Sequence, residues 1–170
     1  MIKKEVLDAM NEQINAESYS AYMYLSMAAY YESIGLSGFA HWMKIQYQEE
    51  AAHAIKFFNY VTERGGKVVL KAIPQVPVDF DGIVDVFEKT LVHENHVTEL
   101  INNLMSVAIA VNDHASQSFL KWFVDEQVEE EANVEKILST LKLINGQGNG
   151  IFLMDRELGQ RVFVDPNAAA

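Results

Sequence analysis

The chain has 170 residues, 49% of them hydrophobic and 22% charged, which is typical of one globular domain with a sizeable core. Its formal net charge of -11 argues against a nucleic-acid partner, because such partners are bound largely by Lys and Arg, and favours cations. The absence of cysteine excludes disulfides, thiolate metal sites and cysteine nucleophiles, so that any metal would be bound by Asp, Glu and His.

Two long helices are predicted in the first part of the chain, where apolar residues recur at spacings of three and four. The first covers residues 4–33. The second follows Gly35, takes Ser37 as its N-cap, and ends at the glycine pair 65–66. Because the turn between them is short, the two helices should be antiparallel neighbours.

Residues 67–81 cannot form an ordinary helix, because they contain two prolines and several β-branched residues. They are long enough to cross from one end of a helical bundle to the other. A third helix is predicted from an N-cap at Asp81 to about Val111, and a fourth from the turn 112–114 to about Ile144. The prediction is therefore an all-α, four-helix bundle with a long crossover between helices 2 and 3.

The sequence GQGNG, residues 146–150, is predicted to end the fourth helix, and a short fifth helix is predicted at about 150–162. This last helix has apolar residues on more than one side and is too short to be stable alone. It should pack either on its own bundle or against symmetry-related copies. We expect a single domain over residues 1–170, with the bundle at about 4–144.

Each long helix has an apolar face, and each face is interrupted near its middle by polar residues. The interruptions are Glu17 in the first helix, Glu50 and His53 in the second, Glu94 in the third, and Gln127 and Glu130 in the fourth. Glu17 and His53 each lie 18 residues from Gly35, and Glu94 and Glu130 each lie 18 residues from Asn112. At a rise of 1.5 Å per residue, all of these side chains would lie about 22 to 27 Å from their turns, in one layer.

Four carboxylates in an apolar interior cannot all stay ionised without compensation, because the cost of burying uncompensated charge is many kcal/mol. No Lys or Arg occupies the matching positions. Two divalent cations would balance four carboxylates, with His53 as a neutral nitrogen ligand, and such ligands suit iron or manganese and can also bind zinc. The alternatives are a metal-free network of carboxyl groups that share protons, or glutamates that face water.

The motif E50-x-x-H53, with Glu17, Glu94 and Q127-x-x-E130, resembles the pattern of the bacterial non-haem ferritins over essentially all 170 positions. The resemblance implies a ferritin-like up-down-down-up bundle with a short fifth helix, and assembly of 24 copies into a hollow cage. It also implies iron storage, with Fe(II) oxidised by dioxygen or hydrogen peroxide at a diiron ferroxidase centre and kept as Fe(III) mineral. The ligands implied for the two irons are Glu17, Glu50 and His53 for one, and Glu50, Glu94 and Glu130 for the other.

The same resemblance implies roles for residues around the centre. Gln127 matches a residue that hydrogen-bonds near the second iron, and Tyr24 matches a tyrosine near the centre that acts in electron transfer, although a core aromatic is the simpler interpretation. A third, outer iron site is implied at Glu49, Glu126, Glu129 and Glu130. The alternative for these glutamates is a solvated acidic face.

Departures from related families narrow the prediction. Ala51 follows Glu50 where bacterioferritins carry a haem-ligating Met, so no haem is expected. Because the chain has no signal-like apolar region near its N-terminus and no run of about 18 apolar residues, we expect a cytoplasmic protein without membrane contact. Two other functions stay open: a diiron oxidase or peroxidase that forms no storage cage, and a non-catalytic helical assembly module.

Overall fold

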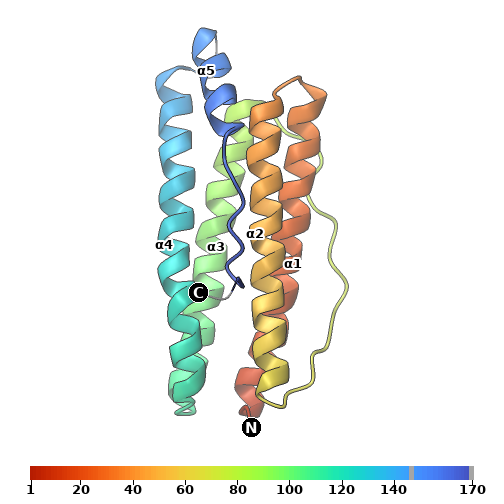
Figure 1. The fold of residues 1–170 in the computed structure, drawn as a ribbon, viewed down its shortest axis with the longest axis vertical. Coiled ribbons are helices and arrows are strands. Elements are labelled where there is room, and N and C mark those ends of the chain that lie inside the picture. Colours follow the sequence, from red (N-terminus) through yellow and green to blue (C-terminus); the bar gives the residue numbers. More distant parts are fainter. Residues whose placement is uncertain (146–147, 169–170) are drawn as a thin grey trace.

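The computed structural model describes residues 1–145 and 148–168, and helix is the only regular secondary structure in them. The helices are α1 (Lys4–Ser33), α2 (Ser37–Glu63), α3 (Ile83–Ala110), α4 (His114–Leu143) and α5 (Asn149–Leu158). The first four run up, down, down and up, and the crossover between α2 and α3 returns along the whole bundle (Figure 1). The predicted all-α bundle with a short fifth helix is confirmed. None of these helices combines the length and apolar character needed to cross a membrane.

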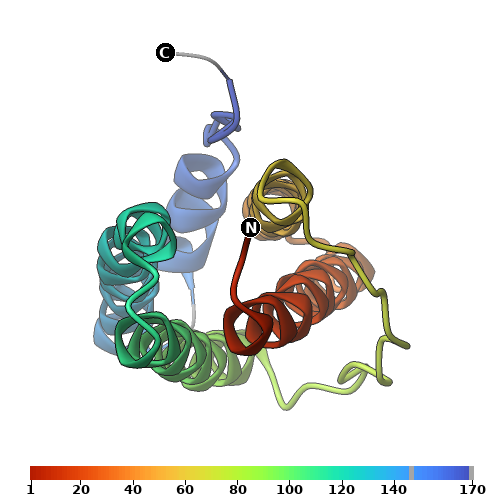
Figure 2. The same cartoon turned by 90° about the horizontal axis from the view of Figure 1, so that it is seen from below.

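The four long helices form a square when viewed along the bundle (Figure 2). In this square α1 packs against α2 and α3, and α3 packs against α4. The crossover is attached to α1, where the Ser26 hydroxyl donates a hydrogen bond to the Pro77 carbonyl at 2.6 Å and the Val69 N–H donates to Asn11 at 2.8 Å. The α5 helix and the residues after it lie on the side where α2 and α4 face each other (Figure 2).

The predicted helix ends are nearly right because left-handed residues stop the helices. Gly35 and Gly65, with φ of 79° and 73°, follow α1 and α2, and Asn112 and Asn145, with φ of 54° and 53°, follow α3 and α4. Such residues let the next backbone N–H bond back to the last helical turn. The predicted stop for α4 at 146–150 falls partly on residues 146 and 147, which lie outside the described residues, and α4 itself ends at Leu143.

Two predicted N-caps are wrong. Leu36, not Ser37, precedes α2, and Gly82, not Asp81, precedes α3; neither makes a side-chain capping bond. At α2 the cap comes from α5, because the Asp155 carboxylate accepts hydrogen bonds from the N–H groups of Gly38 and Phe39 at 2.8 and 3.0 Å. A carboxylate at a helix N-terminus satisfies free N–H groups and favours the helix dipole.

The α5 helix packs with one face on its own bundle. Ile151, Met154 and Leu158 are buried, whereas Phe152 and Leu153 are 62% and 63% exposed. Its backbone crosses α2 so closely that a Cβ at Gly38 would lie 1.6 Å from the Asp155 carbonyl oxygen, which only glycine avoids. The helix ends at Leu158, earlier than predicted, and residues 161–168, hereafter the C-terminal segment, run without helix alongside α2 (Figure 1).

The bundle core consists of two apolar clusters. One, at the end where α5 lies, includes Tyr31, Phe39 and Phe87, and the other, toward the opposite end, includes Met10 and Phe57. The predicted polar residues belong to neither cluster, although they are just as buried. They occupy the middle of the bundle between the two clusters, which is the layer that the sequence predicted.

Candidate metal centre

Glu17 from α1 and Glu50 and His53 from α2, hereafter the first half-site, lie together in the middle of the bundle. Their relative exposures are only 1%, 1% and 2%. Potential ligand atoms of all three lie within 4.8 Å of one another, and His53 Nδ1 is 3.5 Å from Glu50 Oε2. Oxygen and imidazole donors at this spacing could hold one metal ion.

Two atoms of the first half-site have no hydrogen-bond partner, Glu50 Oε2 and His53 Nε2. Buried polar atoms are nearly always paired, because an unpaired one loses its interactions with water. Glu17 differs, since Gln13 donates to its Oε1 at 2.9 Å. The first half-site therefore contains two donor atoms that the protein itself does not use.

Glu94 from α3 and Glu130 from α4, hereafter the second half-site, come from the other pair of helices and are 0% and 3% exposed. Their oxygens are hydrogen-bonded: Tyr24 donates to Glu94 Oε1, and Gln46 donates to Glu130 Oε2 at 2.8 Å. Gln127 lies 3.4 Å from Glu94 Oε2, which makes it a hydrogen-bonding neighbour as predicted.

Burial changes the protonation of these carboxyl groups. It raises the pKa of Glu17 and of Glu50 well above the usual value, and the neighbouring carboxylates raise both further. Burial, followed by the charge of Glu130, raises the pKa of Glu94 to about 8. Without a metal, these groups would hold protons at neutral pH, and a cation that binds there would displace the protons.

The glutamates of the predicted outer site are placed differently. Glu129 is exposed, Glu49 and Glu126 are partly buried, and none of them joins the cluster whose ligand atoms lie within 4.8 Å. Glu49 Oε2 accepts a hydrogen bond from Arg161 Nη2 at 2.6 Å. Burial raises the pKa of Glu49 to about 7 in spite of this arginine, and burial also raises the pKa of Glu126.

Three contacts of the layer were not predicted from the sequence. Gln13 and Gln46 donate to Glu17 and Glu130, and Arg161 donates to Gln46. Gln46 lies on the predicted inward face of its helix, where a buried amide signals a polar partner. Arg161 carries no such signal, because it follows α5 and reaches the layer only through the path of the C-terminal segment.

Comparison with known proteins gives consistent matches over nearly the whole chain. Residues 7–144 match the family model for the ferritin-like domain. A bacterial non-heme ferritin of Bacteroides fragilis (strain 638R) is 45% identical over 161 residues, or 95% of this chain and 100% of the relative. One of Staphylococcus aureus (strain MRSA252) is 39% identical over 163 residues, covering 96% and 98%. An Archaeoglobus fulgidus ferritin engineered into a closed form superposes with a TM-score of 0.95 at 46% identity, covering 96% of this chain and 100% of that one.

Proposed function

Because this chain belongs to the ferritin family, we propose that it stores iron and oxidises Fe(II) at the carboxylate layer between its helices. In this proposal Fe(II) loses electrons to dioxygen or hydrogen peroxide, and the Fe(III) product is deposited as mineral inside a cage of 24 copies. The protein contributes a fixed set of ligands and excludes bulk water, while the redox chemistry belongs to the iron.

We assign one iron to the first half-site and a second to Glu50, Glu94 and Glu130. Glu50 is the proposed bridge because its Oε2 has no hydrogen-bond partner in the protein. Two Fe(II) ions balance the four carboxylates of Glu17, Glu50, Glu94 and Glu130. The observation that carries the assignment is the pair of unpartnered, buried donor atoms, Glu50 Oε2 and His53 Nε2.

The surrounding residues are proposed to orient the ligands. Tyr24, Gln13 and Gln46 each donate to one oxygen of a glutamate in the layer, which leaves the other oxygen available to iron. The position of Tyr24 against Glu94 also supports a role in electron transfer. A third iron at Glu49, Glu126, Glu129 and Glu130 would have to compete with the Arg161 guanidinium for Glu49.

Assembly into a cage is supported by apolar residues left on the surface. Phe152 and Leu153 of α5 are exposed, as are Tyr22 on α1 and Leu70 on the crossover, with relative exposures of 52% to 70%. Apolar groups on several sides suit contacts between copies. Size-exclusion chromatography tests this: a 24-subunit particle is expected, whereas a small oligomer would favour the diiron oxidase alternative.

The ferroxidase proposal is tested by Fe(II) oxidation in air, followed optically, in the wild type and in Glu50→Ala. Loss of the bridge should slow fast oxidation about 100-fold or more, since even outer-shell changes at metal sites cost 10- to 100-fold. Gln48→Ala, at an exposed position two residues away, serves as the matched control and should leave the rate unchanged. An unaltered rate in Glu50→Ala would contradict the assignment, and so would failure of anaerobic equilibrium dialysis to detect two tightly bound Fe(II) per wild-type chain.

A further inference from the structure

The C-terminal segment is held against α2 at several points. The Arg161 carbonyl oxygen lies 2.7 Å from His41 Nε2, the Pro166 carbonyl accepts from Lys56 at 3.0 Å, and Asn167 donates to the Ala52 carbonyl at 2.8 Å. These contacts bring the segment from the end of the bundle down to the level of the metal layer (Figure 1).

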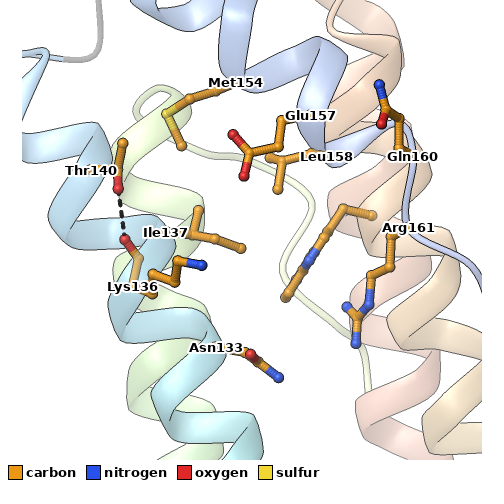
Figure 3. Close-up of a pocket in the computed structure, with 10 residues that line it drawn as sticks. Asn133, Lys136, Ile137, Thr140, Met154, Glu157, Leu158, Gln160 and Arg161 are labelled. Carbon is orange, nitrogen blue, oxygen red and sulfur yellow. Dashed lines mark hydrogen bonds between the residues drawn. The ribbon is translucent and has the colours of Figure 1, made fainter.

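The Arg161 side chain reaches from this segment to two residues of α2. Its Nη1 donates to Gln46 Oε1, its Nη2 donates to Glu49 Oε2 at 2.6 Å, and the guanidinium lies 4.7 Å from the Trp42 ring centre. It borders a cavity of about 390 Å³ between α2, α4 and α5, into which Ile137 and Met154 also project (Figure 3). The planar guanidinium can bind both acceptors and stack on the indole at once, which a lysine ammonium cannot do.

Arg161 thereby determines which way the buried Gln46 amide points. A guanidinium has only donors, so Gln46 must present its oxygen to Arg161 and its NH2 group to Glu130. The resulting hydrogen bond from Gln46 Nε2 to Glu130 Oε2 is 2.8 Å long. A reversed amide would place its oxygen against the carboxylate and its NH2 group against the guanidinium, and both contacts would be repulsive.

We propose that Arg161 is a positioning residue for the second half-site, acting through Gln46 to hold Glu130 Oε2 and leave Glu130 Oε1 for the ion. This inference rests on the proposed metal-binding function. It makes the C-terminal segment, which lies outside the four-helix bundle, part of the metal centre. The competing interpretation is that Arg161 merely attaches the segment to α2.

The test is an anaerobic calorimetric titration of the assembled protein with Co(II), which binds such ligands without being oxidised under these conditions. Arg161→Ala should weaken binding at the second half-site about tenfold and leave the first half-site unchanged, in line with outer-shell partners of other metal sites. Arg161→Lys, which keeps one donor for Gln46, should recover part of the loss. Crystals soaked in Co(II) assign each binding step to a half-site through anomalous scattering.

Two controls separate positioning from attachment. Asn167→Ala removes another contact of the same segment with α2 but has no connection to Glu130, so it should not alter Co(II) binding. In a Gln46→Leu background, Arg161→Ala should have no further effect, because both changes break the same connection. The unfolding temperature of each variant, measured without metal, identifies any general loss of stability.

The inference is overturned if Arg161→Ala binds Co(II) like the wild type, if both half-sites weaken equally, or if Asn167→Ala causes the same loss. These outcomes are distinct from failure of the proposed function. In that case the wild type itself would take up no Co(II) at the layer.

Discussion

The two half-sites occupy matching positions, yet their surroundings differ. Glu17 and His53 lie 77 residues before Glu94 and Glu130, and each pair comes from one antiparallel hairpin. In the first half-site Glu50 Oε2 and His53 Nε2 have no partner, whereas in the second Glu94 and Glu130 accept hydrogen bonds from Tyr24, Gln127 and Gln46. Equal spacing therefore fixes where the ligands lie, but neighbouring donors decide how available they are, and we expect a cation to fill the first half-site first.

The largest expected effect concerns protons, which both half-sites share when no metal is bound. The pKa of Glu94 is about 8 in the folded protein, against a usual value of 4.5, so unfolding releases its proton as the pH rises above 4.5. Stability of the metal-free protein should thus be lost between pH 4.5 and about 8, by on the order of 4 kcal/mol from this group.

Urea unfolding at several pH values measures this loss. Glu94→Gln, which cannot ionise, should show a shallower decline than the wild type, and Co(II) at pH 8 should restore the stability of the wild type. Identical pH profiles for the wild type and Glu94→Gln would contradict the assigned protonation of Glu94.

His53→Ala should break the difference between the half-sites by removing the nitrogen ligand of the first. We expect the affinity of that half-site for Co(II) to fall about 100-fold, because a direct ligand contributes at least as much as an outer-shell partner. Calorimetry should then show the second half-site as the tighter one. His96→Ala, at an exposed position on α3, is the control; retention of the original binding order in His53→Ala would be evidence against the first half-site.

Tyr24→Phe should loosen the second half-site by removing the donor to Glu94 Oε1. Loss of a hydrogen bond to a charged group costs about 1.5 to 3 kcal/mol, so Co(II) affinity at this half-site should drop about tenfold or more. Tyr31→Phe is a matched control, because Tyr31 is equally buried on α1 but donates to the Ile83 carbonyl at 2.9 Å. Equal titrations for the two variants would exclude a specific role for Tyr24.

Gln13→Leu should have the smallest effect, because it removes only the donor to Glu17 Oε1 and keeps a similar volume. A buried carboxyl group that loses one neutral partner is expected to weaken Co(II) binding at the first half-site by about threefold to tenfold. A larger loss than in Tyr24→Phe would reverse the comparison, since the first half-site would then depend more on its donor than the second.

Local patterns in the sequence predicted the four long helices and the height of the metal layer. The spacing of apolar residues is a property of one helix, and short turns fix how neighbouring helices align, so Glu17, Glu50, His53, Glu94 and Glu130 could be placed together. The wrong predictions involve contacts between distant residues. Ser37 and Asp81 looked like N-caps, but the carboxylate that caps α2 is Asp155, more than 100 positions away.

Arg161 could not be assigned for the same reason. No periodic pattern indicates where an extended segment after the last helix will lie, and its course depends on Gly38, which allows α5 to cross α2 closely. The outer glutamates illustrate the opposite case, because their spacing suggested a cation but Glu49 already pairs with this arginine.

The location of the chain end has a practical consequence for purification. The described chain ends at Ala168, where the neighbouring Asn167 is bonded to the Ala52 carbonyl between Glu50 and His53 along α2. A polyhistidine tag fused after Ala170 would therefore start within a few residues of the carboxylate layer, and its imidazoles would compete for the same ions. A tag placed before Met1 would start at the far end of the bundle from α5 (Figure 1).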